Sequence, residues 1–219
     1  MRRAANRAAA TLCAVLAGCA GGPRAPDWQV EAHGAIERYQ QAFLTGASRA
    51  AEAEFARARA ALSATGDATQ VARAELVRCA LEAASLGPAP CPGFETLRAD
   101  AAAPEAAYAD YLAGQPLPAA RAALLPPAHR ALATQAADAD SIARIEDPLS
   151  RLVAAGVALR AGRATPRMIA AAEATASRQG WRRPLLAWLG VQARRAEAAG
   201  DLDAAQRLRR RIALAAGAP

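Results

Sequence analysis

The chain has 219 residues, and its 27 Lys and Arg against 20 Asp and Glu give a formal net charge of +7. All 27 are arginines and about three residues in ten are alanine, a bias that a GC-rich genome explains. The positive charge therefore does not by itself indicate a nucleic-acid-binding protein. Aromatic residues make up only 4% of the chain, which is too few for a sugar-binding cleft.

The first element is an addressing segment at residues 1–18. Its arginine-containing start precedes the apolar run 8–17, which is shorter than the roughly 20 residues that span a membrane. A basic start, a short apolar core and small residues at its end are typical of a secretory signal peptide that is removed. No later segment of the sequence is apolar for long enough to span a membrane.

The signal segment ends with LAG, and Cys19 follows directly. The run LAGC resembles the lipobox of bacterial lipoproteins, whose cysteine receives diacylglycerol and becomes the first residue of the mature chain. The resemblance implies acyl chains such as palmitate on Cys19, with residues 19–27 as the lipidated cysteine and a short tether. Ala20 stands where enterobacterial lipoproteins kept at the inner membrane have Asp, which implies an outer-membrane anchor facing the periplasm. The alternative is a chance cysteine at the end of an ordinary signal peptide.

Three helices are expected in residues 28–86, because apolar residues recur there at steps of three and four. The first ends before Gly46, and the second begins near Ser48, which we expect to be its N-cap. The third follows Asp67 and carries two apolar stripes, so we expect it to pack on two sides. The expected buried residues of the first two helices are Trp28, Ala32, Ile36, Tyr39, Phe43, Ala51, Phe55, Ala58 and Leu62.

Two cysteines of the mature chain, Cys79 and Cys91, remain as an even pair after one leaves with the signal and Cys19 is lipidated. An even pair in an oxidising compartment favours a disulfide. If the helix that holds Cys79 ends near Gly87, four extended residues suffice to bring Cys91 back beside it. A free, buried Cys79 with an exposed Cys91 is the alternative.

Residues 87–147 are interrupted by prolines, which restrict this region to short helices. The clearest of these helices are expected within 104–114 and 126–139. Tyr108 and Tyr111 fall on one side of the first of them. They are either core residues or part of a face that binds a small ligand.

Residues 148–219 predict two regular helix pairs. Gly162, Gly180 and Gly200 stand where glycine commonly ends a helix. The two pairs are offset by about 36 residues, and a helix-turn-helix unit that recurs near this period indicates a helical repeat.

The sequence between Gly46 and Ala58 resembles the second helix of a tetratricopeptide repeat, with Ala51 and Phe55 at the family's spacing. The stretches WLG at 188–190 and AGDLDAA at 199–205 are similar to parts of the same repeat. No unit carries the full Trp, Leu-Gly and Tyr set, and two positions where the family has Ala or a large apolar residue are occupied by Arg167 and Arg209. The resemblance implies an all-α fold in which antiparallel helix pairs form a repeat-like α-solenoid or a helical bundle.

No motif in the sequence predicts catalysis. The Gly-x-Ser-x-Gly, His-Glu-x-x-His, phosphate-loop and dinucleotide patterns are all missing. The two histidines, His33 and His129, show no metal-ligand spacing with either cysteine. We therefore expect a non-catalytic protein with no catalytic residues, no metal site and no cofactor.

The C-terminal segment 178–219 carries nine arginines against three acids. We assign Arg207, Arg210 and Arg211, together with the two tyrosines, to a candidate binding face. Anionic headgroups or an acidic protein surface would suit the arginines, and a solvated helix face is the alternative.

These observations predict a membrane-anchored periplasmic scaffold or adaptor. Its expected partners are the outer membrane, through the lipid, and another envelope protein; nucleic acid is not expected. The alternative is a binding protein for a cell-wall fragment, a lipid or another small ligand.

Overall fold

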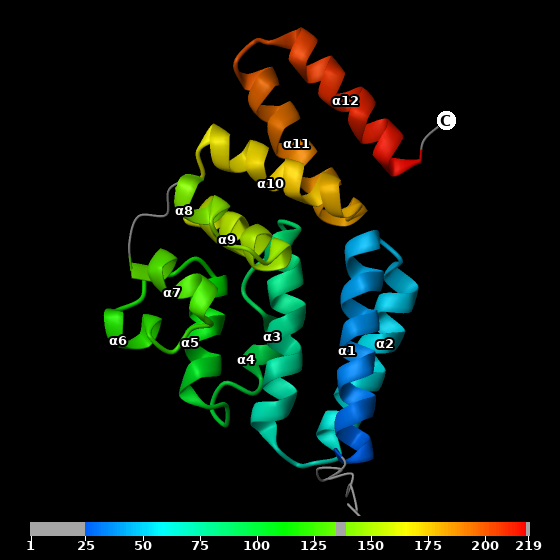
Figure 1. Ribbon diagram of the computed structural model, residues 1–219, viewed down its shortest axis with the longest axis vertical. Coiled ribbons are helices and arrows are strands. Elements are labelled where there is room, and N and C mark those ends of the chain that lie inside the picture. The colour runs from blue at the N-terminus through cyan, green and yellow to red at the C-terminus, as the bar shows by residue number, and fades with distance from the viewer. Residues whose placement is uncertain (1–24, 135–138, 218–219) are drawn as a thin grey trace, which may run out of the picture.

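The computed structural model describes residues 25–134 and 139–217, in which every regular element is a helix. The chain is all-α, as the sequence predicts, and its helices pack against one another in a bundle-like arrangement (Figure 1). Cys19 and the rest of the addressing segment lie outside the described residues. Within the described ranges, no helix is long and apolar enough to cross a membrane.

The first two helices form a hairpin, made of α1 (Asp27–Thr45) and α2 (Ser48–Ser63). Gly46 turns the chain between them with a φ of 84°, a conformation that glycine adopts without steric cost. The expected stripe is buried at Ala32, Tyr39, Phe43, Ala51, Phe55, Ala58 and Leu62. Trp28 and Ile36 are only half-buried.

The expectation that Ser48 caps α2 is wrong. Ala47 occupies the N-cap position, and no described side chain caps the N-terminus of this helix. The Ser48 hydroxyl instead accepts a hydrogen bond from Nη2 of Arg183, 2.8 Å away. The contact with Arg183, 135 positions later in the chain, takes the place of the expected N-cap hydrogen bond. The sequence around Ser48 gives no sign of this distant contact.

The third helix, α3 (Ala68–Ala84), is central and packs on two sides, as its two stripes predict. One face contributes Val71 and Leu81 to a core shared with α1 and α2. The other face contributes Leu76 and Ala83 to a larger core shared with the later helices. In Figure 1, α3 stands between the α1/α2 hairpin and the region of α4 and α5.

The proline-interrupted region forms short helices, as expected. The segment after α3 leads into α4 and then into α5, whose bounds enclose both candidate tyrosines. The bounds are α4 (Pro92–Glu95), α5 (Ala103–Leu112), α6 (Ala119–Ala122), α7 (Pro127–Thr134) and α8 (Ala139–Ala143).

Four longer helices complete the chain: α9 (Pro148–Arg160), α10 (Pro166–Gln179), α11 (Arg182–Ala198) and α12 (Leu202–Ala216). The Asp147 carboxylate accepts the Ser150 amide at 2.6 Å and so caps α9. The buried Trp188 indole donates to the carbonyl of Ala84 at 3.1 Å, which ties α11 to the end of α3. α12 packs mainly on α11 and lies at one end of the long axis, whereas the start of α1 lies at the other (Figure 1).

Candidate functional site

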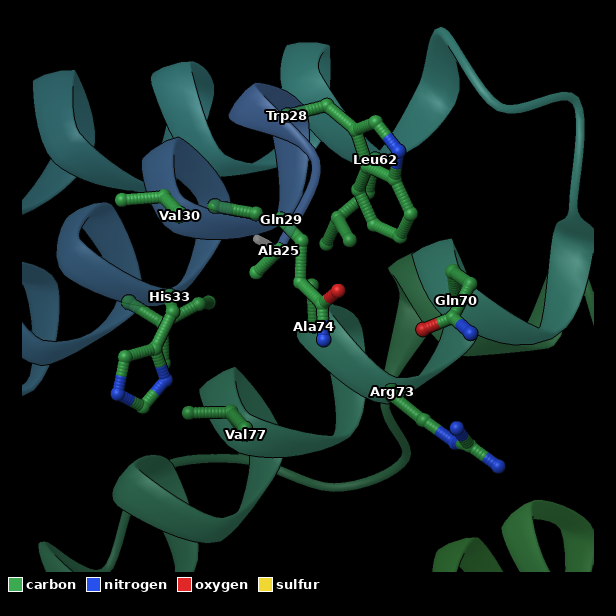
Figure 2. A pocket seen from close by; sticks show the side chains of 12 residues that line it. Ala25, Trp28, Gln29, Val30, His33, Leu62, Gln70, Arg73, Ala74 and Val77 are labelled. Carbon is green, nitrogen blue, oxygen red and sulfur yellow. The ribbon is translucent and has the colours of Figure 1, made fainter. Parts of the chain in front are cut away.

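An apolar groove of about 650 Å³ lies between α1 and α3, beside the start of α1. Its walls come from three helices, because the end of α2 closes the groove next to α1 and α3 (Figure 2). The apolar residues that line it include Trp28, Val30, Ile36, Leu62, Ala74 and Val77. We call this feature the α1/α3 groove.

The groove explains why Trp28 and Ile36 are not fully buried although they belong to the apolar stripe of α1. α1 and α3 each pack closely on α2, and their facing sides near the start of α1 leave this space between them. Figure 2 shows the Trp28 indole beside Leu62. Val30 lies off the stripe and is 61% exposed, which is high for a large aliphatic side chain.

The charged side chains around the groove have partners within the protein. His33 Nε2 lies 3.3 Å from a carboxylate oxygen of Glu37, one helical turn along α1. Arg73 points away from the groove in Figure 2, and its Nε donates to the buried Glu105 carboxylate at 2.7 Å. Among the described residues that line the groove there is no serine, cysteine or carboxylate, so its chemistry suits binding of an apolar group.

Tyr111, one of the candidate binding residues, is a core residue in the structure, with 2% of its surface exposed. Its hydroxyl lies 3.2 Å from Nδ1 of the buried His129, and Tyr108 stacks against both rings. Burial lowers the pKa of His129 to about 4, and burial raises the pKa of each tyrosine. These three side chains form a neutral aromatic cluster between α5 and α7.

Tyr108 is half-buried and also lines a second cavity, of about 340 Å³, between α3, α5 and the α6–α7 loop. Glu105 lines the same cavity, and its Oε2 has no hydrogen-bond partner among the described residues. The structure therefore separates the two tyrosines: Tyr111 is enclosed, and Tyr108 alone borders a cavity.

The three candidate arginines of α12 also differ from one another. Nη2 of Arg211 lies 2.5 Å from the Glu173 carboxylate of α10, so its charge is neutralised within the protein. Arg207 and Arg210 are exposed, and neither makes an ion pair with another described residue. The intervening Arg209 pairs with Glu197 of α11 at 2.7 Å.

Arg207, Arg210 and Leu214 follow one another at steps of three and four, which places them on one side of α12. The residues that face α11, Ala205, Leu208 and Ile212, lie on the opposite side. Leu214 is 80% exposed. We call Arg207, Arg210 and Leu214 the α12 outer face.

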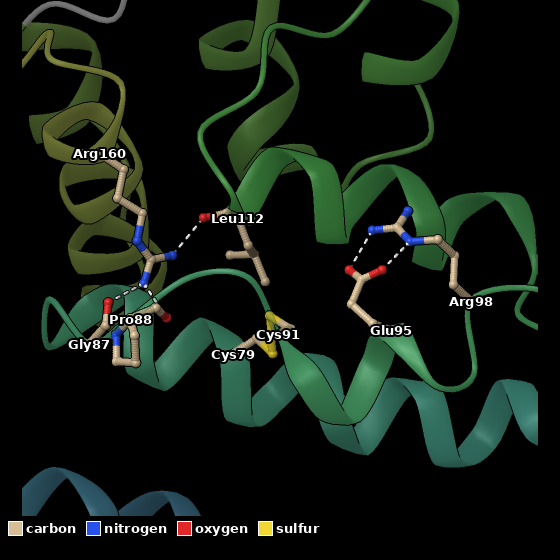
Figure 3. The surroundings of a disulfide bond; sticks show 8 residues. All are labelled: Cys79, Gly87, Pro88, Cys91, Glu95, Arg98, Leu112 and Arg160. Atoms are coloured by element: carbon tan, nitrogen blue, oxygen red, sulfur yellow. Dashed lines mark hydrogen bonds and ion pairs between the residues drawn. A yellow bond between two sulfur atoms is a disulfide. The ribbon is translucent and has the colours of Figure 1, made fainter.

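Cys79 and Cys91 form a disulfide in the structure, with their Cα atoms 5.7 Å apart, so the pairing chosen from the sequence agrees with the geometry. Arg160 of α9 stabilises the chain between them (Figure 3). Its guanidinium donates to the carbonyl oxygens of Gly87 and Leu112, each at 2.6 Å, and burial lowers its pKa. The disulfide loop is therefore held to both α5 and α9.

No group of three or more His, Cys, Asp or Glu side chains that could bind a metal occurs among the described residues. Comparison with known proteins adds no further assignment, because no family model, no curated protein and no solved structure matches the chain.

The sequence did not point to the α1/α3 groove, because Trp28, Ala32, Ile36 and Leu62, which line it, were assigned to the core. Val30 was the one available signal, being a large aliphatic residue outside the apolar stripe of its helix.

Proposed function

We propose that the protein is a lipid-anchored periplasmic scaffold of the outer membrane and that it binds another envelope protein through the α12 outer face. Lipidation of Cys19 would anchor the start of α1 to the membrane. α12 lies at the opposite end of the long axis (Figure 1), where a tethered protein would present it to the periplasm.

The observation that carries the proposal is the contrast among neighbouring arginines of one helix. Arg209 and Arg211 are paired with carboxylates of this protein, whereas Arg207 and Arg210 have no ion pair with any described residue and lie beside a leucine that is 80% exposed. Unpaired cations around an exposed apolar side chain suit a partner surface with acidic residues around an apolar patch. The nearest acid on the same helix, Asp203, is one turn before Arg207.

The test is photo-crosslinking in intact cells from a diazirine amino acid at Leu214, with a probe at the exposed Ala60 of α2 as the control position. We expect one protein to be crosslinked from position 214 and not from position 60, through a peptide rich in Asp and Glu. The double variant Arg207→Glu/Arg210→Glu should lose this adduct.

A matched double variant, Arg144→Glu/Arg163→Glu, changes the total charge equally at exposed arginines outside α12. It should keep the adduct, and all variants should keep the wild-type Tm. Equal adducts from both probe positions, or equal loss in both double variants, would contradict the α12 outer face as the binding surface.

A second candidate function, binding of a lipid or another small apolar molecule, is favoured by the α1/α3 groove. The thermal shift of the Cys19→Ser protein with palmitate, compared with peptidoglycan fragments, separates the ligand classes. A ligand at about 100 times its Kd stabilises the folded state by about 2.7 kcal/mol. A shift with peptidoglycan fragments alone would instead favour the cavity at Tyr108.

A further inference from the structure

We propose that the α1/α3 groove binds an acyl chain of the lipid attached to Cys19 of the same molecule whenever that chain is outside a bilayer. This inference rests on the lipidation of Cys19, which is part of the proposed function, and it assigns the groove a ligand. It is independent of the α12 outer face.

The chain between Cys19 and the groove is short. Six peptide units separate Cys19 from Ala25, which is itself one of the residues lining the groove. Six residues span at most about 20 Å when fully extended. The lipid is therefore always within reach of the groove mouth, whatever path residues 20–24 take.

The walls of the groove are mostly apolar and so suit an acyl chain. Acyl chains carry no polar group to satisfy, and eight of the twelve lining residues are apolar. The two charged or titratable side chains at the edge, His33 and Arg73, already face Glu37 and Glu105. The described residues that line the groove therefore present no unpaired charge that a polar ligand would have to neutralise. Each methylene group buried in the groove favours the bound form about fourfold.

The size of the groove suits an unbranched chain better than a helix. The wall that α1 provides runs from Trp28 to Ile36, a length of about 12 Å at 1.5 Å per residue. An α-helix with its side chains is about 10 to 12 Å wide, so a partner helix would seat only one face in a groove of about 650 Å³. An unbranched chain can be enclosed along the whole length, and it would cover the exposed Val30 and the half-buried Trp28.

The consequence is a protein with two states of its anchor. In the presence of a membrane the acyl chains are in the bilayer and the groove is open. In water without a membrane, the groove shields at least one chain, which keeps the lipidated protein from aggregating through its anchor.

The experiment uses the full-length lipidated protein with a diazirine amino acid at Val77, and the same probe at the exposed Ala60 as the control. Intact mass spectrometry first establishes the lipid on Cys19. After detergent removal and irradiation, we expect an adduct that joins the acyl chain of the Cys19 peptide to the Val77 peptide. A mixture of isotope-labelled and unlabelled protein should show this adduct within single molecules.

Vesicles of phosphatidylethanolamine and phosphatidylglycerol should reduce the adduct at least tenfold, because the chain then enters the bilayer. A Gln29→Trp variant, which fills the groove from its exposed edge, should reduce it to a similar extent in water. Gln115→Trp, an equal change at an exposed loop residue far from the groove in sequence, should leave it at the wild-type level.

The outcomes separate the inference from the proposed function. If the mass shows no lipid on Cys19, both the anchor and this inference are wrong. If the lipid is present but the adduct forms equally from Ala60, forms only between two copies, or joins Val77 to another protein, the groove inference is wrong and the anchored scaffold remains.

Discussion

The hydroxyl of Tyr111 lies 3.2 Å from Nδ1 of His129, inside the aromatic cluster between α5 and α7. His129 is 2% exposed, and burial lowers its pKa from 6.5 to about 4, against a smaller opposing effect of the Asp147 carboxylate. The native state therefore keeps this imidazole neutral at a pH where the unfolded chain protonates it.

This difference in pKa predicts that stability falls as the pH is lowered. The folded pKa is below the unfolded one, so between pH 6.5 and 4 the unfolded state binds a proton that the native state excludes, and the free energy of unfolding decreases. We expect His129 to account for a loss of roughly 2 kcal/mol between pH 7 and pH 5, measured by urea unfolding.

The variant that isolates this contribution is His129→Phe, which keeps an aromatic ring and removes the titration. Its loss of stability between pH 7 and pH 5 should be smaller than that of the wild type by about the same 2 kcal/mol. His33→Gln, at a side chain that is 75% exposed, should retain the wild-type loss. Identical pH profiles for His129→Phe and the wild type would show that His129 is not the source.

Tyr39 and Tyr111 provide a matched pair, because both are buried and only one hydroxyl has a partner. The Tyr39 hydroxyl makes no hydrogen bond to any described residue, although its ring packs against Phe43 and Phe55. A buried unsatisfied polar group costs about 1 to 3 kcal/mol, so Tyr39→Phe should raise the free energy of unfolding by about 1 kcal/mol or more. Tyr111→Phe removes the bond to His129 and should lower it by about 1 to 2 kcal/mol. Equal effects of the two substitutions in chemical denaturation would contradict this assignment.

Gly156 and Gly190 provide a second pair, which tests the packing of α9 on α3. A Cβ at Gly156 would overlap the carbonyl oxygen of Ala83 and lie 2.8 Å from its carbonyl carbon, so Gly156→Ala should destabilise the protein by about 3 kcal/mol. A Cβ at Gly190, inside α11, would meet only the end of the Arg194 side chain at 3.5 Å. Gly190→Ala should therefore be neutral or stabilise by up to about 1 kcal/mol, as read from the two Tm values. A stable Gly156→Ala variant would mean that α3 and α9 are farther apart than described.

The sequence predicted the features that depend on neighbouring residues. The ends of α1 at Gly46 and of α10 at Gly180 follow from local backbone chemistry. The two-sided packing of α3 follows from two apolar stripes on one helix, which need no knowledge of the partner helices.

The features that the sequence missed depend on contacts between distant segments. Ser48 resembles an N-cap, but the position of Arg183 decides its hydrogen bond. His129 was not assigned to the core, because α7 has eight residues and so short a helix shows too little periodicity. The α1/α3 groove depends on how two helices diverge, and an apolar stripe is the same whether a neighbouring helix covers it fully or only in part.

The Cys79–Cys91 disulfide closes a loop whose ends are 12 residues apart, and it predicts the last effect. Restricting a loop of this length in the unfolded chain stabilises the native state by roughly 3 kcal/mol, so reduction should lower the free energy of unfolding by about that amount. The double variant Cys79→Ala/Cys91→Ala should match the reduced wild type to within the cost of truncating the buried Cys79.

Arg160 still donates to the Gly87 and Leu112 carbonyls after reduction, so the loop should stay in place and the far-ultraviolet circular dichroism should be unchanged. Arg160→Gln should weaken this support, and reduction should then release the loop, which proteolysis near Pro88 would detect. A reduced wild type with unchanged unfolding midpoint would show that the disulfide does not stabilise the fold.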